Sequence, residues 1–427
     1  RIRQTLPAGF GEAMKILHVV HGYPPSMGGS QWLIKNLSEQ LVTRYHDEVT
    51  VFTTVAYNTE YFWGADKTAM EAGTETINGV TVRRFPVFNR LNFARRLLAS
   101  LFYRLRLPYN DWFRTLETGP IIFGLQKAVA ESQADVVLAA TFPLLHMYDM
   151  QAGSRRAAIP NALLGAIHTA DPWGYDRPML YRAIRQADAY IALTPFERDY
   201  LIQRGIEANK IAVIGAGIDT APFLATNGIT ARQKYGWGED PVIATIGKQN
   251  SRKRLDVLIA AMRQVWVHTP QAHLLIAGGQ STYSEKLQAL IHTLPPQQQR
   301  QIVVLSNFEE AEKPNLLAAC DIFVLPSGEE SFGIAFIEAW ACGKPVIGTR
   351  SGAIPSVIAE GQDGLIVKYG DADELAQAIQ TLLQAPERRE TLGNAGRKKV
   401  LENYTWEIVT DQLRTVYTKI TGSKETS

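Results

Sequence analysis

The chain has 427 residues, too many for one ordinary hydrophobic core, so two domains are expected. Its formal net charge of +2 is close to neutral, and nothing in the overall charge suggests a nucleic-acid-binding protein. The two cysteines, Cys320 and Cys342, show no metal-ligand spacing and favour a reducing compartment, which we take to be the cytoplasm. No apolar run reaches about 18 residues, so no transmembrane helix is expected.

Short apolar segments alternate with helix-length segments in the first half of the chain. Almost unbroken apolar runs are typical of parallel strands that are covered on both faces. We predict strands at 15–20, 48–54, 81–85, 135–140, 163–167 and 189–193. We predict helices at 30–45, about 119–132, 179–186 and 195–204.

The same pattern then restarts in the second half. Strands are predicted at 241–247, 273–278, 302–305, 322–326, 345–349 and 364–367. Helices are predicted at 254–267, 283–293, 313–319, 334–341 and 374–383. Gly215 and Gly217 punctuate the chain between the halves. The fold class is therefore α/β, with two doubly wound, Rossmann-like domains at 14–214 and 215–403.

The most informative segment is 326–345, where a strand ends in a loop and a new helix follows Gly333. The first turn of a helix presents unpaired N–H groups and a positive dipole end, which suit a diphosphate. Glu330 lies in the loop and Glu338 lies in the second turn of the helix. Carboxylates accept hydrogen bonds from neighbouring hydroxyls, as a sugar or ribose offers. These residues suit a nucleotide sugar, although solvated loop and helix charges would look the same.

A second cluster follows the predicted strand at 241–247. Lys248, Arg252, Lys253 and Arg254 lie where that strand ends, and open α/β sheets bind ligands at the carboxyl ends of their strands. Cations there would neutralise the charge that develops on a diphosphate leaving group. Lys248, next to the strand end, is the best candidate, while Arg252 and Arg254 are as well explained by solvation.

The first domain offers two weaker signals. Gly28 and Gly29 lie between the first strand and the first helix, where glycines let the backbone approach a phosphate or sugar closely. They do not form the GxGxxG of dinucleotide-binding enzymes, which disfavours an NAD-dependent oxidoreductase. His168 follows the strand predicted at 163–167, where a structural role and a role in a ligand site are equally consistent with its position.

Taken together, these segments resemble glycosyltransferase family 4, the large retaining family with the GT-B fold. The resemblance extends from Lys15 to about Trp406. Its most specific element is the Glu-x7-Glu pattern from Glu330 to Glu338, with Phe332 and Gly333 inside it and Ala339 to Ile347 after it. It implies two Rossmann-like domains that face each other across a cleft. It also implies a C-terminal helix, at about 404–422, that crosses back to complete the first domain.

The resemblance assigns roles to these residues. It implies that His168 and Glu330 act in catalysis, with Glu330 at the donor sugar, and that Glu338 binds the ribose. Asn307 and Phe308 match the loop that frames the base. The residues assigned to the donor diphosphate are Gly28, Gly29, Lys248, Lys253, Gly333, Ile334 and Ala335. An arginine is usual at the position of Lys248, so the charge is kept but the planar fork is lost.

The function predicted is transfer of a hexose-type sugar, with retention, from a UDP- or GDP-sugar to a hydroxyl of a glycan, a lipid-linked or a small-molecule acceptor. No cofactor and no metal are expected, since no Asp-x-Asp motif is present and lysines and helix N–H groups can supply the compensation. A donor phosphate would take the acceptor proton in a same-face displacement. Alternatives are a non-catalytic nucleotide-sugar binder and an epimerase or phosphorylase with the GT-B fold.

Residues 83–114 form an unusual basic and apolar stretch. Eight arginines lie there among aromatic residues and leucines, with Asp111 as the only acid. A stretch of this kind can lie on an anionic membrane surface, which would place the protein at the inner face of the membrane. The alternative is an ordinary helix pair that packs its apolar side on the first domain and leaves the arginines in water.

Overall fold

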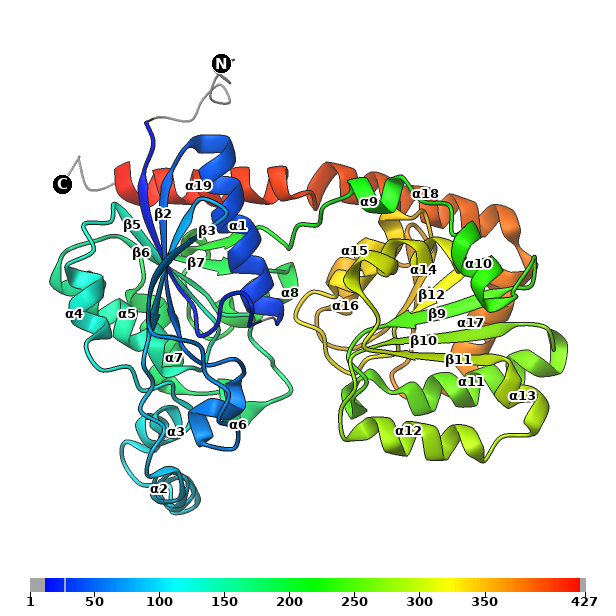
Figure 1. Ribbon diagram of the computed structural model, residues 1–427, viewed down its shortest axis with the longest axis horizontal. Coiled ribbons are helices and arrows are strands. Elements are labelled where there is room, and N and C mark those ends of the chain that lie inside the picture. Colours follow the sequence, from blue (N-terminus) through cyan, green and yellow to red (C-terminus); the bar gives the residue numbers. More distant parts are fainter. Residues whose placement is uncertain (1–11, 27, 423–427) are drawn as a thin grey trace. The chain divides into compact units, whose positions relative to one another are not determined.

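The computed structural model describes residues 12–26 and 28–422. The chain forms two compact units: one contains the chain up to Gly215 together with the chain from Trp406 on, and the other is Ala216–Thr405. Each unit has its own sheet with helices on both faces (Figure 1).

The sheet of the first unit has the strand order β3-β4-β2-β1-β5-β6-β7-β8. All neighbouring strands are parallel except β3, which pairs antiparallel with β4 at the edge. The strands are β1 (Lys15–Val19), β2 (Glu48–Thr54), β3 (Gly73–Ile77), β4 (Val80–Phe85), β5 (Val136–Ala140), β6 (Asn161–Leu164), β7 (Ala189–Ala192) and β8 (Ile211–Val213).

Alternate residues of β1 face opposite helix layers, as the two-residue period of a strand requires. Leu17 and Val19 pack in one core with α4, α5 and α7. His18 points the other way, to Ser38 of α1 and Tyr417 of α19. The helices of this unit are α1 (Gly29–Tyr45), α2 (Asn92–Arg104), α3 (Asn110–Thr118), α4 (Leu125–Ala130), α5 (Leu145–Arg156), α6 (Pro172–Tyr175), α7 (Pro178–Gln186), α8 (Pro195–Ile202) and α19 (Trp406–Gly422), with the 3-10 helices η1 (Thr59–Trp63) and η2 (Ala208–Lys210).

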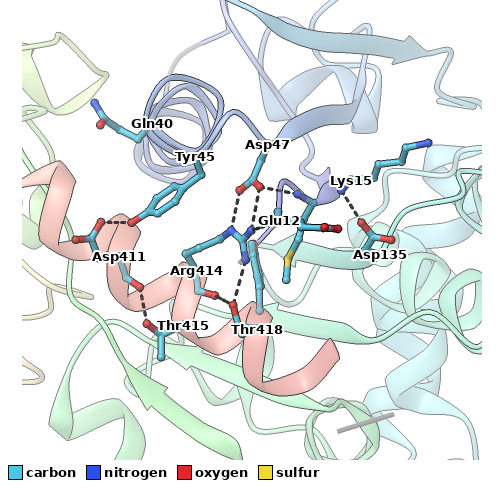
Figure 2. Close-up of polar contacts among 12 residues, drawn as sticks. Glu12, Lys15, Gln40, Tyr45, Asp47, Asp135, Asp411, Arg414, Thr415 and Thr418 are labelled. Carbon is cyan, nitrogen blue, oxygen red and sulfur yellow. Dashed lines mark hydrogen bonds and ion pairs between the residues drawn. The ribbon is translucent and has the colours of Figure 1, made fainter. Parts of the chain in front are cut away.

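A buried ion pair fixes α19 to the first unit, although nearly the whole chain separates its partners. Arg414 donates from Nε and Nη2 to the two oxygens of Asp47, at 2.9 and 3.1 Å, and from Nη2 to the carbonyl of Glu12 (Figure 2). Both side chains are almost completely buried. The fork of arginine matches a carboxylate, so this pair sets the position of α19 against α1.

The sheet of the second unit is wholly parallel, with the order β11-β10-β9-β12-β13-β14. Its strands are β9 (Val242–Ile246), β10 (His273–Gly278), β11 (Ile302–Ser306), β12 (Ile322–Val324), β13 (Val346–Thr349) and β14 (Gly364–Val367). Its helices are α9 (Ala221–Leu224), α10 (Ile229–Tyr235), α11 (Leu255–His268), α12 (Tyr283–His292), α13 (Pro296–Arg300), α14 (Lys313–Ala319), α15 (Ile334–Ala341), α16 (Ile354–Val357), α17 (Ala372–Gln384) and α18 (Pro386–Asn403), with η3 (Ser251–Lys253) and η4 (Glu310–Glu312).

Several elements differ from the sequence expectation. The helix expected at about 119–132 is only Leu125–Ala130, because a loop that includes Pro120 precedes it. The strand expected at 163–167 ends at Leu164, so His168 follows a short loop rather than the strand itself. Arg83 and Arg84 belong to β4, so the helical part of the basic stretch begins only at Asn92. The strand β3 was not predicted, because it is an almost fully exposed edge strand without an apolar run.

Candidate functional site

The phosphate site was predicted at the first turn of α15, in the second unit. Gly333 precedes the helix with φ of 92°, a left-handed conformation that favours glycine. A Cβ there would lie 2.6 Å from the ring of Phe336. Ile334 and Ala335 are half-buried, and as the first helical residues their N–H groups have no partner within the helix. The turn can therefore offer backbone donors to an anion.

Lys253 and Glu330 come together although 77 residues separate them in sequence. The ammonium Nζ of Lys253 lies 2.5 Å from Oε1 of Glu330, and each side chain keeps a limited exposure. The backbone holds the two loops in the same place, because Gly328 donates its N–H to the carbonyl of Arg252 at 3.0 Å. The arrangement brings a cation from the loop after β9 to a carboxylate that lies four residues before the start of α15.

Glu338 is buried inside α15 and is not a solvated charge. Its Oε1 lies 2.9 Å from Nζ of Lys313, which also pairs with Glu310. Burial raises the pKa of the Glu338 carboxyl, and the Lys313 ammonium opposes this shift. A buried carboxylate with a cation at one oxygen is held in position to accept hydrogen bonds from hydroxyls.

Lys313 was missed because it lies on another helix and in no recognisable motif. It is the first residue of α14, 25 positions before Glu338. Its one local sequence signal is the acidic 3-10 helix η4 directly before it. Nothing in that spacing points to Glu338.

The other basic residues after β9 have different surroundings. Lys248 is exposed. Arg254 pairs with Asp256 at 3.0 Å and lies over the ring of Tyr369, which supports its interpretation as a structural or solvated residue. Gln249, which the sequence did not single out, is buried and donates to Ser306 Oγ at 3.2 Å. The signal that could have found it is its place just after the end of β9.

Asn307 and Phe308 follow β11, directly after Ser306, the residue that accepts the hydrogen bond from Gln249. Asn307 has φ of 55° and is exposed, and its Oδ1 accepts from the N–H of Gln280 at 3.1 Å. Phe308 is half-buried. Asn307 therefore links the loops after β10 and β11, the position where the base-framing loop was predicted.

Gly28 and Gly29 begin α1 at the carboxyl end of β1 in the first unit. Gly28 is extended, with φ of −170°, so its conformation alone does not require glycine. A Cβ there would lie 2.5 Å from Oε1 of Gln31, whereas a Cβ on Gly29 meets nothing within 4 Å. Both residues are exposed, so their backbone is open to a ligand.

His168 lies at the same carboxyl edge, since β1 and β6 are both parallel to β5 between them. It is half-buried and its ring meets that of Tyr175 edge-on at 5.3 Å. A buried carboxylate supports the loop before it. Oε1 of Glu197 accepts from the N–H of Ile167 at 3.0 Å and from the hydroxyl of Tyr190 at 2.6 Å. Burial raises the pKa of Glu197.

Glu197 was also missed, because it reads in sequence as an ordinary first-turn charge of α8. Its Oε2 accepts from the N–H of Leu193 at 2.9 Å, so the carboxylate joins the ends of β6 and β7. Position 165 has no space for a side chain, since a Cβ on Gly165 would lie 2.0 Å from the hydroxyl of Tyr190.

Between residues 12 and 422, apart from residue 27, no three His, Cys, Asp or Glu side chains gather as metal ligands would. Within the same residues, no helix is long and apolar enough to cross a membrane.

Two family models match consecutive parts of the chain. The model described as "Glycosyl transferase 4-like domain" matches residues 28–217, and the one described as "Glycosyl transferases group 1" matches residues 229–399.

Curated relatives match almost the full chain. A GDP-mannose-dependent alpha-(1-6)-phosphatidylinositol monomannoside mannosyltransferase of Mycolicibacterium smegmatis is 26% identical over 404 residues, which are 92% of this chain and 95% of that protein. A GDP-mannose-dependent monoacylated alpha-(1-6)-phosphatidylinositol monomannoside mannosyltransferase of Corynebacterium glutamicum is 28% identical over 411 residues, 94% of this chain and 97% of that protein.

Solved structures show the same fold. The Anabaena protein Alr3699/HepE in complex with UDP is 20% identical, with a TM-score of 0.71, over 95% of this chain and 100% of that one. Sucrose-phosphate synthase from Thermosynechococcus elongatus is also 20% identical, with a TM-score of 0.71, over 96% of this chain and 100% of that one.

Proposed function

Because the chain belongs to glycosyltransferase family 4 and has the GT-B fold, we propose that it transfers mannose from GDP-mannose to a hydroxyl of a lipid-linked acceptor, with retention. It is a glycosyltransferase that uses a nucleotide sugar. The two full-length relatives, whose names specify GDP-mannose and phosphatidylinositol mannosides, support the finer assignment.

The observation that carries the proposal is the pairing of Lys253 with Glu330 beside the first turn of α15. The donor diphosphate would bind the N–H groups of Ile334 and Ala335 and draw Lys253 toward it. Glu330 would then be free to accept a hydrogen bond from a hydroxyl of the donor sugar. Glu338 would accept hydrogen bonds from the ribose hydroxyls. A metal is not needed for this charge balance, since Lys253, Lys248 and the helix end are all positive.

The proposed chemistry is a same-face displacement at the anomeric carbon. The bond from this carbon to the phosphate oxygen breaks as the bond to the acceptor oxygen forms. The acceptor proton passes to the departing phosphate, so no enzyme nucleophile is required. The charge on the leaving group is what the lysines and the backbone N–H groups stabilise. His168, at the carboxyl edge of the first sheet, would contact the donor sugar.

The test begins with thermal shifts in GDP, UDP, ADP and their sugars, with and without EDTA. A selective shift with GDP and GDP-mannose that survives EDTA supports the assigned donor. GDP release from GDP-mannose is then measured with phosphatidylinositol mannosides and with soluble glycans as acceptors. Retention is read from the anomeric proton of the product, and an inverted product would refute the mechanism. An isomerised donor or a sugar phosphate would instead identify an epimerase or a phosphorylase.

A further inference from the structure

The helices α2 and α3 expose the apolar side chains that an ordinary helix pair would bury. We define the α2–α3 face by six of these residues: Phe93, Leu97, Leu101, Leu105, Tyr109 and Trp112. Their exposed fractions run from 45% at Leu101 to 82% at Phe93. Large apolar patches are rare on monomeric proteins and usually mark an interaction site. The helix pair lies at the opposite end of the first unit from α19 (Figure 1).

The inward side of the pair is held by arginines. Arg95 is 7% exposed and donates to the carbonyl of Phe62 at 3.0 Å. Arg114 is 3% exposed and lies over the rings of Tyr103 and Trp173, at 4.7 and 5.1 Å from their centroids. Arg95 and Arg114 are thus buried while apolar side chains such as Phe93 and Leu97 are exposed, which differs from a pair that buries its apolar side and leaves all its arginines in water. The exposed apolar face is part of a packed structure.

The pair is also internally fixed. The rings of Phe102 and Phe113 meet across the two helices, with centroids 4.0 Å apart and planes tilted by 37°, which ties α2 to α3. Phe93, Leu97 and Leu101 recur every four residues on α2 and share one side of that helix. A preorganised apolar face costs less to bind than one that must first become ordered.

Cations border the α2–α3 face. Arg90, Arg96, Arg104 and Arg106 are exposed, whereas the acid of this stretch, Asp111, is half-buried. Exposed aromatic and aliphatic side chains beside arginines match the chemistry of an anionic lipid surface, which offers hydrocarbon below a layer of negative charge. Tyr109 and Trp112 suit the boundary between these layers.

We infer that the α2–α3 face docks this enzyme on an anionic phospholipid bilayer. The apolar side chains enter the headgroup region, and the bordering arginines bind lipid phosphates. The role of this contact rests on the proposed function, since it brings a lipid-linked acceptor to the carboxyl edge of the first sheet. The contact itself rests on the exposed face alone.

The experiment is co-sedimentation of the full chain with vesicles of phosphatidylglycerol and phosphatidylcholine. One variant carries Phe93→Ser, Leu97→Ser and Leu101→Ser, and another carries Arg96→Gln, Arg104→Gln and Arg106→Gln. Each is expected to lower the partition coefficient about tenfold or more. The wild-type chain should also bind less in 0.5 M salt and less to pure phosphatidylcholine.

Matched controls make the same kinds of change on exposed residues elsewhere. These are Leu224→Ser, Ile229→Ser and Val267→Ser for the apolar set, and Arg155→Gln, Arg156→Gln and Arg182→Gln for the charged set. Both should bind vesicles within about twofold of wild type. All variants should keep the wild-type Tm, because the replaced side chains are exposed.

Two results would overturn the inference. One is a folded chain that binds no anionic vesicle, or binds equally in the test and control variants. The other is a dimer in solution that the serine variant dissociates, which would make a second copy of the chain the occupant. Nucleotide-induced thermal shifts, measured on the same samples, report on the donor site independently. If the chain binds anionic vesicles but shows no nucleotide-induced thermal shift, the proposed function is contradicted and the inference about the docking surface is not.

Discussion

Nζ of Lys313 lies 2.9 Å from Oε1 of the buried Glu338, so the carboxylate assigned to the ribose is part of an ion pair between α14 and α15. We expect Lys313→Met to lower the free energy of unfolding by about 3 kcal/mol, because it leaves a buried charge without its partner. The double variant Lys313→Met, Glu338→Gln should recover most of this loss. Chemical denaturation measures both.

The exposed pair of Lys234 and Glu312, at 3.1 Å, is the matched control. Lys234→Met should change the free energy of unfolding by less than about 1 kcal/mol. Equal effects at the two lysines would show that the Glu338 pair is solvated.

Replacements of Lys253 and Glu330 should separate diphosphate binding from sugar transfer. Lys253→Met is expected to weaken GDP binding about tenfold, because a charge-assisted contact to phosphate is lost. Glu330→Gln should keep or tighten GDP binding, since Lys253 no longer has a carboxylate partner, while kcat falls about 100-fold. Calorimetry with GDP and initial rates with the sugar donor measure the two effects. Parallel loss of GDP affinity in both variants would contradict the separate roles.

Glu197→Gln tests the support of the His168 loop. Both oxygens of Glu197 accept from N–H groups, so an amide would turn its own NH2 toward one of these donors. We expect a loss of about 2 kcal/mol in the free energy of unfolding and a fall in kcat at least as large as in Tyr190→Phe. His168→Ala should lower kcat with little change in Tm. An active, fully stable Glu197→Gln would rule out a positioning role.

Three buried histidines in the first unit should make the protein sensitive to acid. Burial lowers the pKa of His18 and His21 to about 3 and that of His146 to about 4. The unfolded chain takes up these protons near pH 6.5, whereas the folded chain does not, so stability is present above pH 6.5 and lost as pH falls toward 3. At pH 5 each histidine should lower the free energy of unfolding by about 2 kcal/mol relative to neutral pH.

Unfolding measured between pH 7 and pH 4.5 tests this dependence. His18→Gln should flatten the slope, whereas replacement of His46, which is exposed, should leave it unchanged. A stability that does not vary in this range would mean that the three histidines take up protons at the same pH in the folded and in the unfolded chain.

The ion pair of Arg414 and Asp47 should hold α19 in place. Arg414→Met leaves Asp47 buried and unpaired, and we expect a loss of about 3–5 kcal/mol in the free energy of unfolding of the first unit. Arg44, which pairs with Asp411 on the same helix at 2.9 Å but is partly exposed, supplies the control. Arg44→Met should cost about 1 kcal/mol or less. A similar loss in both would mean that burial is not what makes the Arg414 pair matter.

The sequence alone determined the family and the α/β class, and it placed most residues of the proposed donor site in recognisable segments. Parallel strands buried on both faces leave continuous apolar runs such as Val242–Ile246, and these are visible without any tertiary information. Glu330, Gly333 and Glu338 lie within one loop and one helix, so their relation is set by local geometry that spacing can reveal.

Only the tertiary structure decided which charges are buried and which partners they have. Lys313 reaches Glu338 from another helix, and Glu197 reaches Ile167 across 30 residues. Such pairs depend on how distant elements pack, which no periodicity records. In α2 the pattern left open whether the apolar side chains or the arginines face inward. The fold places Arg95 inside, where it donates to the carbonyl of Phe62, and leaves Leu97 exposed.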